Sequence, residues 1–279
     1  YYAEQGEWAQ ADYHFDQAEA LVQASVDLGA DLGAYISTVE ERIHINAIHF
    51  RGDFAQGIAR LEGLLHLLDT STSPIVNAET IRVQLLRSLC MLATRHRDYG
   101  LAIRYAKATL AWVEQIAHRM RQSAALLDLA LAEQFAGLYN EAVTHNHAAL
   151  AIAAEIGDLD QVALLKANLC LTLRQQGELA TALDYGLAAI ESLHTLGIRR
   201  LEGQARNRVG HTLLALERWA DAEVAYRAAL TVWELMQHPN RYEAVAGRAV
   251  ALVHLGEPAE AVQLVHAVLE FVATQDLVG

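Results

Sequence analysis

The sequence has few residues that interrupt regular structure. Its 279 residues include only 3 prolines and 17 glycines, too few to separate the many short strands of a β-sandwich or barrel. It also has no apolar run of about eighteen residues, no charged-then-apolar leader and no Asn-x-Ser/Thr sequon. Because alanine and leucine dominate what remains, we predict an all-α protein that is neither secreted nor inserted in a membrane.

Cysteine is equally scarce. Cys90 and Cys170 lie far apart in apolar surroundings, and neither belongs to a CxxC or Cys/His group that could hold zinc. This usage is typical of a reducing, cytoplasmic setting. We predict that both residues act as small hydrophobic packing residues.

Basic residues are in the minority. Lysine and arginine number 21 against 34 aspartates and glutamates, which gives a formal net charge of -13. Such a charge repels nucleic-acid phosphates and anionic lipid surfaces. We therefore predict that this segment binds neither nucleic acid nor a membrane directly.

Catalytic and cofactor motifs are also missing. The sequence contains no GxxxxGK[ST] phosphate loop, no GxSxG elbow, no HExxH and no acidic calcium loop. Its 13 histidines include no pair at helical i,i+4 spacing, and acidic pairs such as Glu40 and Glu41 are predicted to be solvated helix faces. We predict no enzymatic activity, no metal and no cofactor.

An internal repeat is present throughout the chain. Seven similar segments occur at intervals of about 40 residues, a period that indicates stacked helical units; they begin at Gly6, Gly52, Arg97, Gly137, Gly177, Glu217 and Gly256. Each reads as a turn followed by an amphipathic helix, here called the second helix of a repeat. The fifth position after the turn is small, as two closely packed helices require; it holds Ala11, Gly57, Ala102, Ala142, Ala182, Ala222 and Ala261.

A further amphipathic stretch, the first helix of the repeat, precedes each turn. Seven residues before the turn a second small residue recurs, and Ile45 alone departs from it; the others are Cys90, Ala130, Cys170, Gly210 and Ala249. The unit is therefore a helical hairpin with small residues where its helices meet.

This pattern resembles the tetratricopeptide repeat. That signature has a Gly-Asp/Glu-aromatic turn and then an alanine, aromatic and alanine ladder, which stands here as Ala222, Tyr226 and Ala229. Gly186 and Asn146 replace the ladder aromatic in two repeats. The resemblance implies a right-handed superhelical α-solenoid of about seven hairpins, with a period near 40 rather than about 34.

The long period and three short segments are similar to one subclass. These are IGD at 156–158, LG at 196–197 and ANL at 167–169. The repeat arrays that they resemble lie at the C-terminal end of STAND-class signalling ATPases, including bacterial transcription activators that sense small inducers. Similar arrays are also fused to caspase-like proteases.

We expect residues 1–279 to form a single solenoid that is a piece of a longer protein. The chain opens at Tyr1 without a methionine, inside a repeat, so its first hairpin exposes an apolar flank and self-association is an expected possibility. The irregular stretch DTSTSP begins at Asp69, which predicts a sub-domain joint at 69–77.

The concave face of such an array is where the family binds its partners. Carrying the family's inward-facing positions onto the first helices gives the candidate ligand-binding residues Arg42, Asn46, His49, Gln84, Arg87, Met91, Arg95, Gln134, Asn168, Arg174, Asn207, Arg208 and His211. The inward-facing positions hold five arginines and only two acidic residues, Asp128 and Glu243. We therefore hypothesise an acidic peptide, a peptide C-terminus or a small anionic effector; arginines that are merely solvated, or paired with acids of the next repeat, are the alternative.

Three functions remain open. The first is the sensor or interaction part of a STAND-type transcriptional or signalling regulator, which binds a protein, peptide or small effector. The second is a stand-alone adaptor or scaffold for protein–protein interaction. The third is a regulatory array fused to a caspase-like protease.

Overall fold

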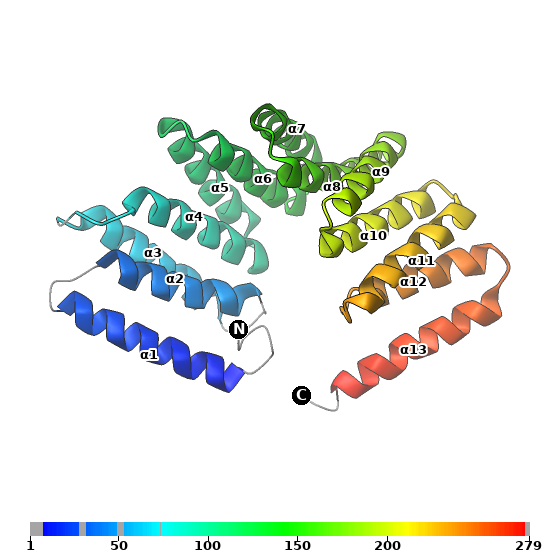
Figure 1. The fold of residues 1–279 in the computed structure, drawn as a ribbon, viewed down its shortest axis with the longest axis horizontal. Helices are drawn as coiled ribbons and strands as arrows, with labels where there is room; N and C mark the ends of the chain where they lie inside the picture. The colour runs from blue at the N-terminus through cyan, green and yellow to red at the C-terminus, as the bar shows by residue number, and fades with distance from the viewer. Residues whose placement is uncertain (1–7, 28–31, 49–52, 73, 277–279) are drawn as a thin grey trace. The chain divides into compact units, whose positions relative to one another are not determined.

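The computed structural model describes residues 8–27, 32–48, 53–72 and 74–276, and within these ranges the chain is helical, without a strand. Thirteen helices are described (Figure 1). They are α1 (Trp8–Asp27), α2 (Leu32–Ile48), α3 (Phe54–Thr70), α4 (Ala78–Arg95), α5 (Tyr99–Gln115), α6 (Arg119–Phe135), α7 (Tyr139–Ile156), α8 (Leu159–Gln176), α9 (Leu179–Thr195), α10 (Arg199–Ala215), α11 (Trp219–Leu235), α12 (Arg241–His254) and α13 (Pro258–Asp276). The all-α fold predicted from the sequence is confirmed.

The chain forms two compact units. The first unit is Tyr1–Leu138 and contains α1 to α6; the second is Tyr139–Gly279 and contains α7 to α13. Within each unit, helices that follow one another in the sequence pack side by side (Figure 1). The loop at 71–77 lies inside the first unit, and the sub-domain joint predicted at 69–77 stays a prediction.

The helices alternate as the repeat pattern predicts. The even-numbered helices α2 to α12 are the first helices of their repeats, and the odd-numbered helices are the second helices. The turn glycines Gly6 and Gly52 lie outside the described residues.

An aspartate side chain caps the helix that follows it at three turns, at Asp53, Asp98 and Asp158, and Asp98 shows how. Its backbone N–H donates to Ala93 O at 2.9 Å, which closes the end of α4. Its carboxylate accepts from Leu101 N at 3.0 Å, which caps the start of α5. The same residue therefore satisfies groups at two helix ends.

The residue that ends most of these helices has a left-handed backbone. Glycine supplies this conformation in several turns, but Ala117 adopts it with φ 52° between α5 and α6. A Cβ makes the left-handed region unfavourable by about 1 to 2 kcal/mol.

We expect Ala117→Gly to raise the free energy of unfolding by about 0.5 to 1 kcal/mol, because the lost strain exceeds the added entropy of the unfolded chain. Urea unfolding followed by circular dichroism measures it. Ala136→Gly is the matched control, since Ala136 has an ordinary φ of -76° at the end of α6. An equal effect of the two substitutions would contradict the strain at Ala117.

The small residues of the repeat lie where the helices pack. Ala102, Ala142, Ala182 and Ala222 are fully buried. The two cysteines are free and buried in the hydrophobic cores of their respective units, so their predicted role in packing is confirmed.

Side-chain volume at the ladder position is matched by the neighbouring helices. The Tyr226 ring on α11 is fully buried against Gly210 on α10 and Gly247 on α12. At the same position of α9 the residue is Gly186, where a Cβ would lie 2.5 Å from Val209 and 2.8 Å from Cys170. Large and small residues have exchanged places, so the interhelical space stays filled in both repeats.

Candidate functional site

A cavity of about 1120 Å³ opens on the first helices of the first unit. Its walls come from α2, α4 and α6, and residues 97 and 99 at the α4–α5 turn close one side. Below, this cavity is called the first-unit groove. Its volume is slightly above the range of about 300 to 1,000 Å³ that is usual for small-molecule sites.

The residues predicted on this face are only partly brought together. Gln84, Arg87, Met91 and Arg95 of α4 line the groove. Arg42 turns toward α1 instead and forms ion pairs at 2.7 Å with Asp16 and 3.1 Å with Glu19. Arg42 is thus not among the residues that line the groove, and its assignment to the ligand-binding face stays a prediction.

Three other predicted residues of this unit are not among those lining the groove. Asn46 lies on α2 away from the lining, and Gln134 of α6 is buried. His49 lies outside the described residues.

One end of the groove is apolar. Met91, Leu131 and Phe135 line it, and the ring of Phe135 stacks on Tyr99 with a centroid separation of 6.3 Å and an interplanar angle of 15°. Phe135 is nevertheless 55% exposed. An exposed aromatic surface held flat by a second ring favours contact with an apolar side chain of a ligand.

An ion pair occupies the middle of the groove. Arg87 Nε on α4 donates to Asp128 Oδ2 on α6 at 2.5 Å, and the Arg87 side chain is 49% exposed. The negative charge of Asp128 raises the pKa of Arg87. Burial raises the pKa of Asp128, and the charge of Arg87 opposes that rise. Asp128 therefore orients Arg87 and leaves its outer N–H groups facing the groove.

A hydrogen-bonded group that sequence reasoning missed lies on the α2 side. Ser88 Oγ on α4 donates to Glu40 Oε1 on α2, and His44 Nδ1 lies 3.0 Å from the same hydroxyl. Glu40 is buried, so the prediction that it belongs to a solvated face is wrong, whereas its neighbour Glu41 is exposed. The helical spacing of α2 could have distinguished Glu40 from Glu41, because adjacent residues of a helix point about 100° apart.

In the second unit four of the predicted residues lie in two hydrogen-bonded groups, a pair between Arg208 and Asn168 and a network around Glu243. Arg208 on α10 donates to Asn168 Oδ1 on α8 at 2.9 Å. Asn207 Nδ2 donates to Glu243 Oε2 on α12 at 2.8 Å, and His211 Nε2 lies 2.9 Å from Glu243 Oε1. The hydrogen bond with His211 lowers the pKa of Glu243, with burial acting in the opposite direction.

This network extends to the ladder tyrosine. Tyr226 OH lies 2.7 Å from His211 Nδ1, so both ring nitrogens of His211 have partners. Burial raises the pKa of Tyr226, which remains protonated at neutral pH. Tyr226 thus fixes the orientation of a side chain on the first-helix face.

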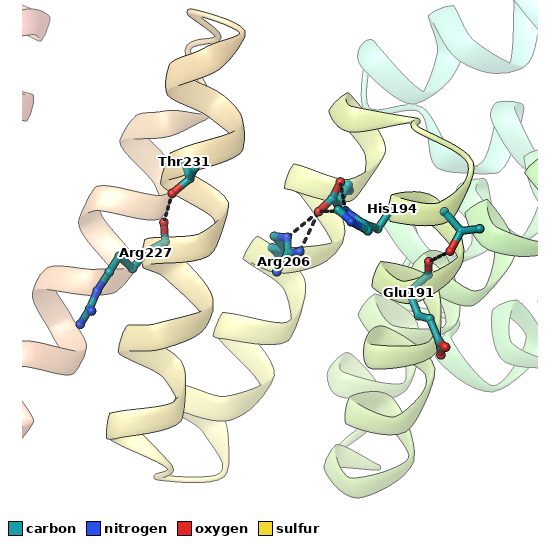
Figure 2. Close-up of polar contacts among 7 residues, drawn as sticks. Glu191, His194, Arg206, Arg227 and Thr231 are labelled. Carbon is teal, nitrogen blue, oxygen red and sulfur yellow. Dashed lines mark hydrogen bonds and ion pairs between the residues drawn. The ribbon is translucent and has the colours of Figure 1, made fainter.

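Elsewhere in the second unit four arginines have carboxylate partners: Arg206, Arg218, Arg227 and Arg248. Arg206 Nη2 and His194 Nδ1 lie 2.7 and 3.3 Å from Glu202 Oε1, as Figure 2 shows. Arg227 in the same figure, whose carbonyl accepts from Thr231, pairs through its guanidinium with Glu223. Arg206 and Arg227 therefore have acids of their own unit as partners, as Arg42 and Arg87 have in the first unit.

No group of three metal-ligating side chains occurs within the described residues. Across the same portion of the chain, no helix has the length and apolar character needed to span a bilayer.

Stacked helical hairpins with small residues at the helix contacts and polar groups gathered on the first helices define a TPR-like helical repeat fold. The predicted resemblance to tetratricopeptide repeat arrays, including that of a STAND ATPase, is confirmed at the level of fold by solved structures.

Three solved structures show the likeness. BtubC (BKLC) from P. vanneervenii has a TM-score of 0.71 and 17% identity, over 81% of this chain and 93% of its own. A STAND protein with a tetratricopeptide repeat sensor from Pyrococcus horikoshii has a TM-score of 0.70 and 17% identity, over 88% of this chain and 37% of its own. A Rap protein complexed with competence and sporulation factor has a TM-score of 0.70 and 18% identity, over 96% of this chain and 75% of its own.

No protein-family model matches the sequence, and no curated protein matches it either.

Proposed function

We propose that this chain is a non-catalytic recognition module and that its first-unit groove binds a peptide or a segment of a protein. The observation that carries the proposal is a cavity of about 1120 Å³ that combines an apolar end with an oriented, half-exposed arginine. Ligand sites typically combine such a surface with a few polar groups that fix orientation.

The finer proposal concerns the larger protein. One similar structure is named as a STAND protein with a tetratricopeptide repeat sensor, and another as a Rap protein complexed with competence and sporulation factor. These names support a regulatory array at the C-terminal end of a STAND-type transcriptional or signalling regulator. The chain spans 37% of the STAND protein that it resembles. An ATPase part adjoining this chain is therefore only a proposal. The buried free thiols of Cys90 and Cys170 support work in a reducing cytoplasm.

A stand-alone adaptor is the second candidate. BtubC is covered over 93% of its length, so a repeat array of this extent exists as a chain of similar size. Upstream coding sequence separates the two candidates, because only the regulator requires an adjoining phosphate-loop ATPase.

The ligand's polar contact would fall on Arg87. Asp128 uses one edge of its guanidinium, and the remaining N–H groups suit a carboxylate of an acidic peptide or a small anionic effector.

Met91→Arg tests the groove by placing a long charged side chain at its apolar end. The peptides are first selected from a random heptapeptide phage library against the unaltered chain. Their affinity for the variant should be at least about tenfold lower, because losing a central contact reduces the binding free energy by about 1.4 kcal/mol or more. Isothermal titration calorimetry with the synthetic peptides measures the loss.

Leu67→Arg is the matched control, because Leu67 is exposed on α3 outside the groove and should leave the affinity within about twofold of the original. The proposal fails if no peptide is enriched, or if the control substitution weakens binding as much as Met91→Arg.

A further inference from the structure

Two arginines of the second unit lack the carboxylate partner that their neighbours have. Arg208 on α10 donates a single hydrogen bond, to the neutral Asn168 Oδ1 at 2.9 Å. Arg174 on α8 has no acceptor for its buried Nε among the residues that the structure describes. A buried donor without an acceptor is unfavourable by about 1 to 3 kcal/mol, so such a group favours an acceptor supplied from outside.

The two guanidinium groups repel each other electrostatically. Burial lowers the pKa of Arg208, and repulsion by the charge of Arg174 adds to that effect. Both charges also act on one thiol, because they oppose the rise that burial produces in the pKa of Cys170. Both positive charges therefore act on one residue of α8, the helix against which α10 packs.

Glu243 on α12 accepts a hydrogen bond from Asn207 and lies against His211, and it has no hydrogen bond with Arg174 or Arg208. Glu243 attracts Arg208 electrostatically, but its two oxygens are already engaged by Asn207 and His211. Tyr226 holds His211 from the other side at 2.7 Å. The acid is thus held in place by neutral or titratable groups, and the hydrogen-bonding capacity of both guanidiniums remains available.

We propose that Arg174 and Arg208, together with Asn168, form an anion-binding site on the first helices of the second unit. Guanidinium groups recognise carboxylate and phosphate through paired, fork-like hydrogen bonds. The ligand is an oxyanion of one of these two kinds, carried by a peptide or by a small effector. The site needs no residue of the first-unit groove, so it stands or falls independently of the function proposed for that groove.

The arginine side chains themselves report binding. In the full chain labelled with ¹⁵N-arginine, we expect the Nε–Hε resonances of Arg174 and Arg208 to shift saturably when inorganic phosphate or acetate replaces chloride at constant ionic strength. A lower dissociation constant for phosphate identifies a phosphate site, and one for acetate identifies a carboxylate site. No saturable shift with either anion overturns the proposal.

Substitutions give the matched comparison. Arg208→Gln and Arg174→Gln should each weaken binding at least about tenfold, the loss of one charged hydrogen bond. Arg218→Gln is the control, because Arg218 pairs with Asp221 on the exposed surface, and it should change the dissociation constant less than about twofold. Arg208→Lys keeps the charge and serves if Arg208→Gln does not fold; undiminished phosphate and acetate binding in Arg208→Lys and Arg174→Gln overturns the site.

Discussion

Tyr226→Ala is expected to lower the free energy of unfolding of the second unit by about 3 to 5 kcal/mol, the range for truncating a large aromatic residue in a core. The ring is fully buried between α10 and α12, and its hydroxyl also lies 2.7 Å from His211 Nδ1. Urea unfolding by circular dichroism measures the loss, and hydrogen exchange of α10 to α12 localises it.

The glycine opposite the ring allows a test in which the sign of the effect reverses. A Cβ at Gly210 would lie 2.7 Å from the Tyr226 ring, so Gly210→Ala alone should destabilise by about 1 to 3 kcal/mol through overpacking. In the Tyr226→Ala background the obstacle is gone, and the same substitution should stabilise by about 0.5 to 1 kcal/mol through helix propensity. The same sign in both backgrounds would show that ring and glycine do not compete for the space.

Glu223→Gln is the second substitution with a large expected effect. The Glu223 carboxylate on α11 is buried and pairs with Arg227 and with Arg248, whose Nε lies 2.7 Å from Oε1. Removing one partner of a buried ion network is unfavourable by about 3 to 5 kcal/mol. We expect Glu223→Gln to lower the free energy of unfolding by about 3 kcal/mol at neutral pH, because Arg227 is largely exposed and Arg248 keeps its pair with Glu260. Denaturant unfolding near pH 7 provides the value.

The pH dependence of stability distinguishes this network from simple packing. Burial acts to raise the pKa of Glu223, but hydrogen bonds and charges from Arg227 and Arg248 outweigh it and lower the pKa below 4.5. A depressed pKa gives stability that is present above the unfolded value and is lost as pH falls through the folded value. The difference in stability between the original chain and Glu223→Gln should therefore shrink below about pH 4.5.

Glu234→Gln on the exposed side of the same helix should leave both the stability and its pH dependence nearly unchanged. If the Glu223→Gln difference stayed constant as the pH falls through that range, the ionised carboxylate would not be the stabilising group.

Much of the fold follows from local patterns in the sequence. The small residue five positions after each turn fixed the register of the hairpins, and Ala102 and Ala222 are fully buried as that register requires. The compensation around Tyr226 could not be predicted, because it depends on which residues of α10 and α12 face one ring. Gly210 and Gly247 are informative only once that contact is known.

The candidate site was less predictable for a related reason. A helical face can be assigned from spacing, which correctly brought Gln84 and Arg87 to the groove. Side-chain direction depends on charges from other helices, and acids on α1 draw Arg42 away. The same reasoning could not separate Arg87, which has Asp128 as its partner, from Arg174, whose Nε has no acceptor among the described residues.

The double use of Asp98 has a consequence for how such chains change in length. Because one residue completes the hydrogen bonding of the helix before it and the helix after it, the turn inside this hairpin needs no polar group from a distant part of the sequence. Adding or deleting a whole hairpin then alters only the apolar faces of its two neighbours. The length of the array, and with it the span of the recognition surface, can vary by whole repeats while the local folding rules stay the same.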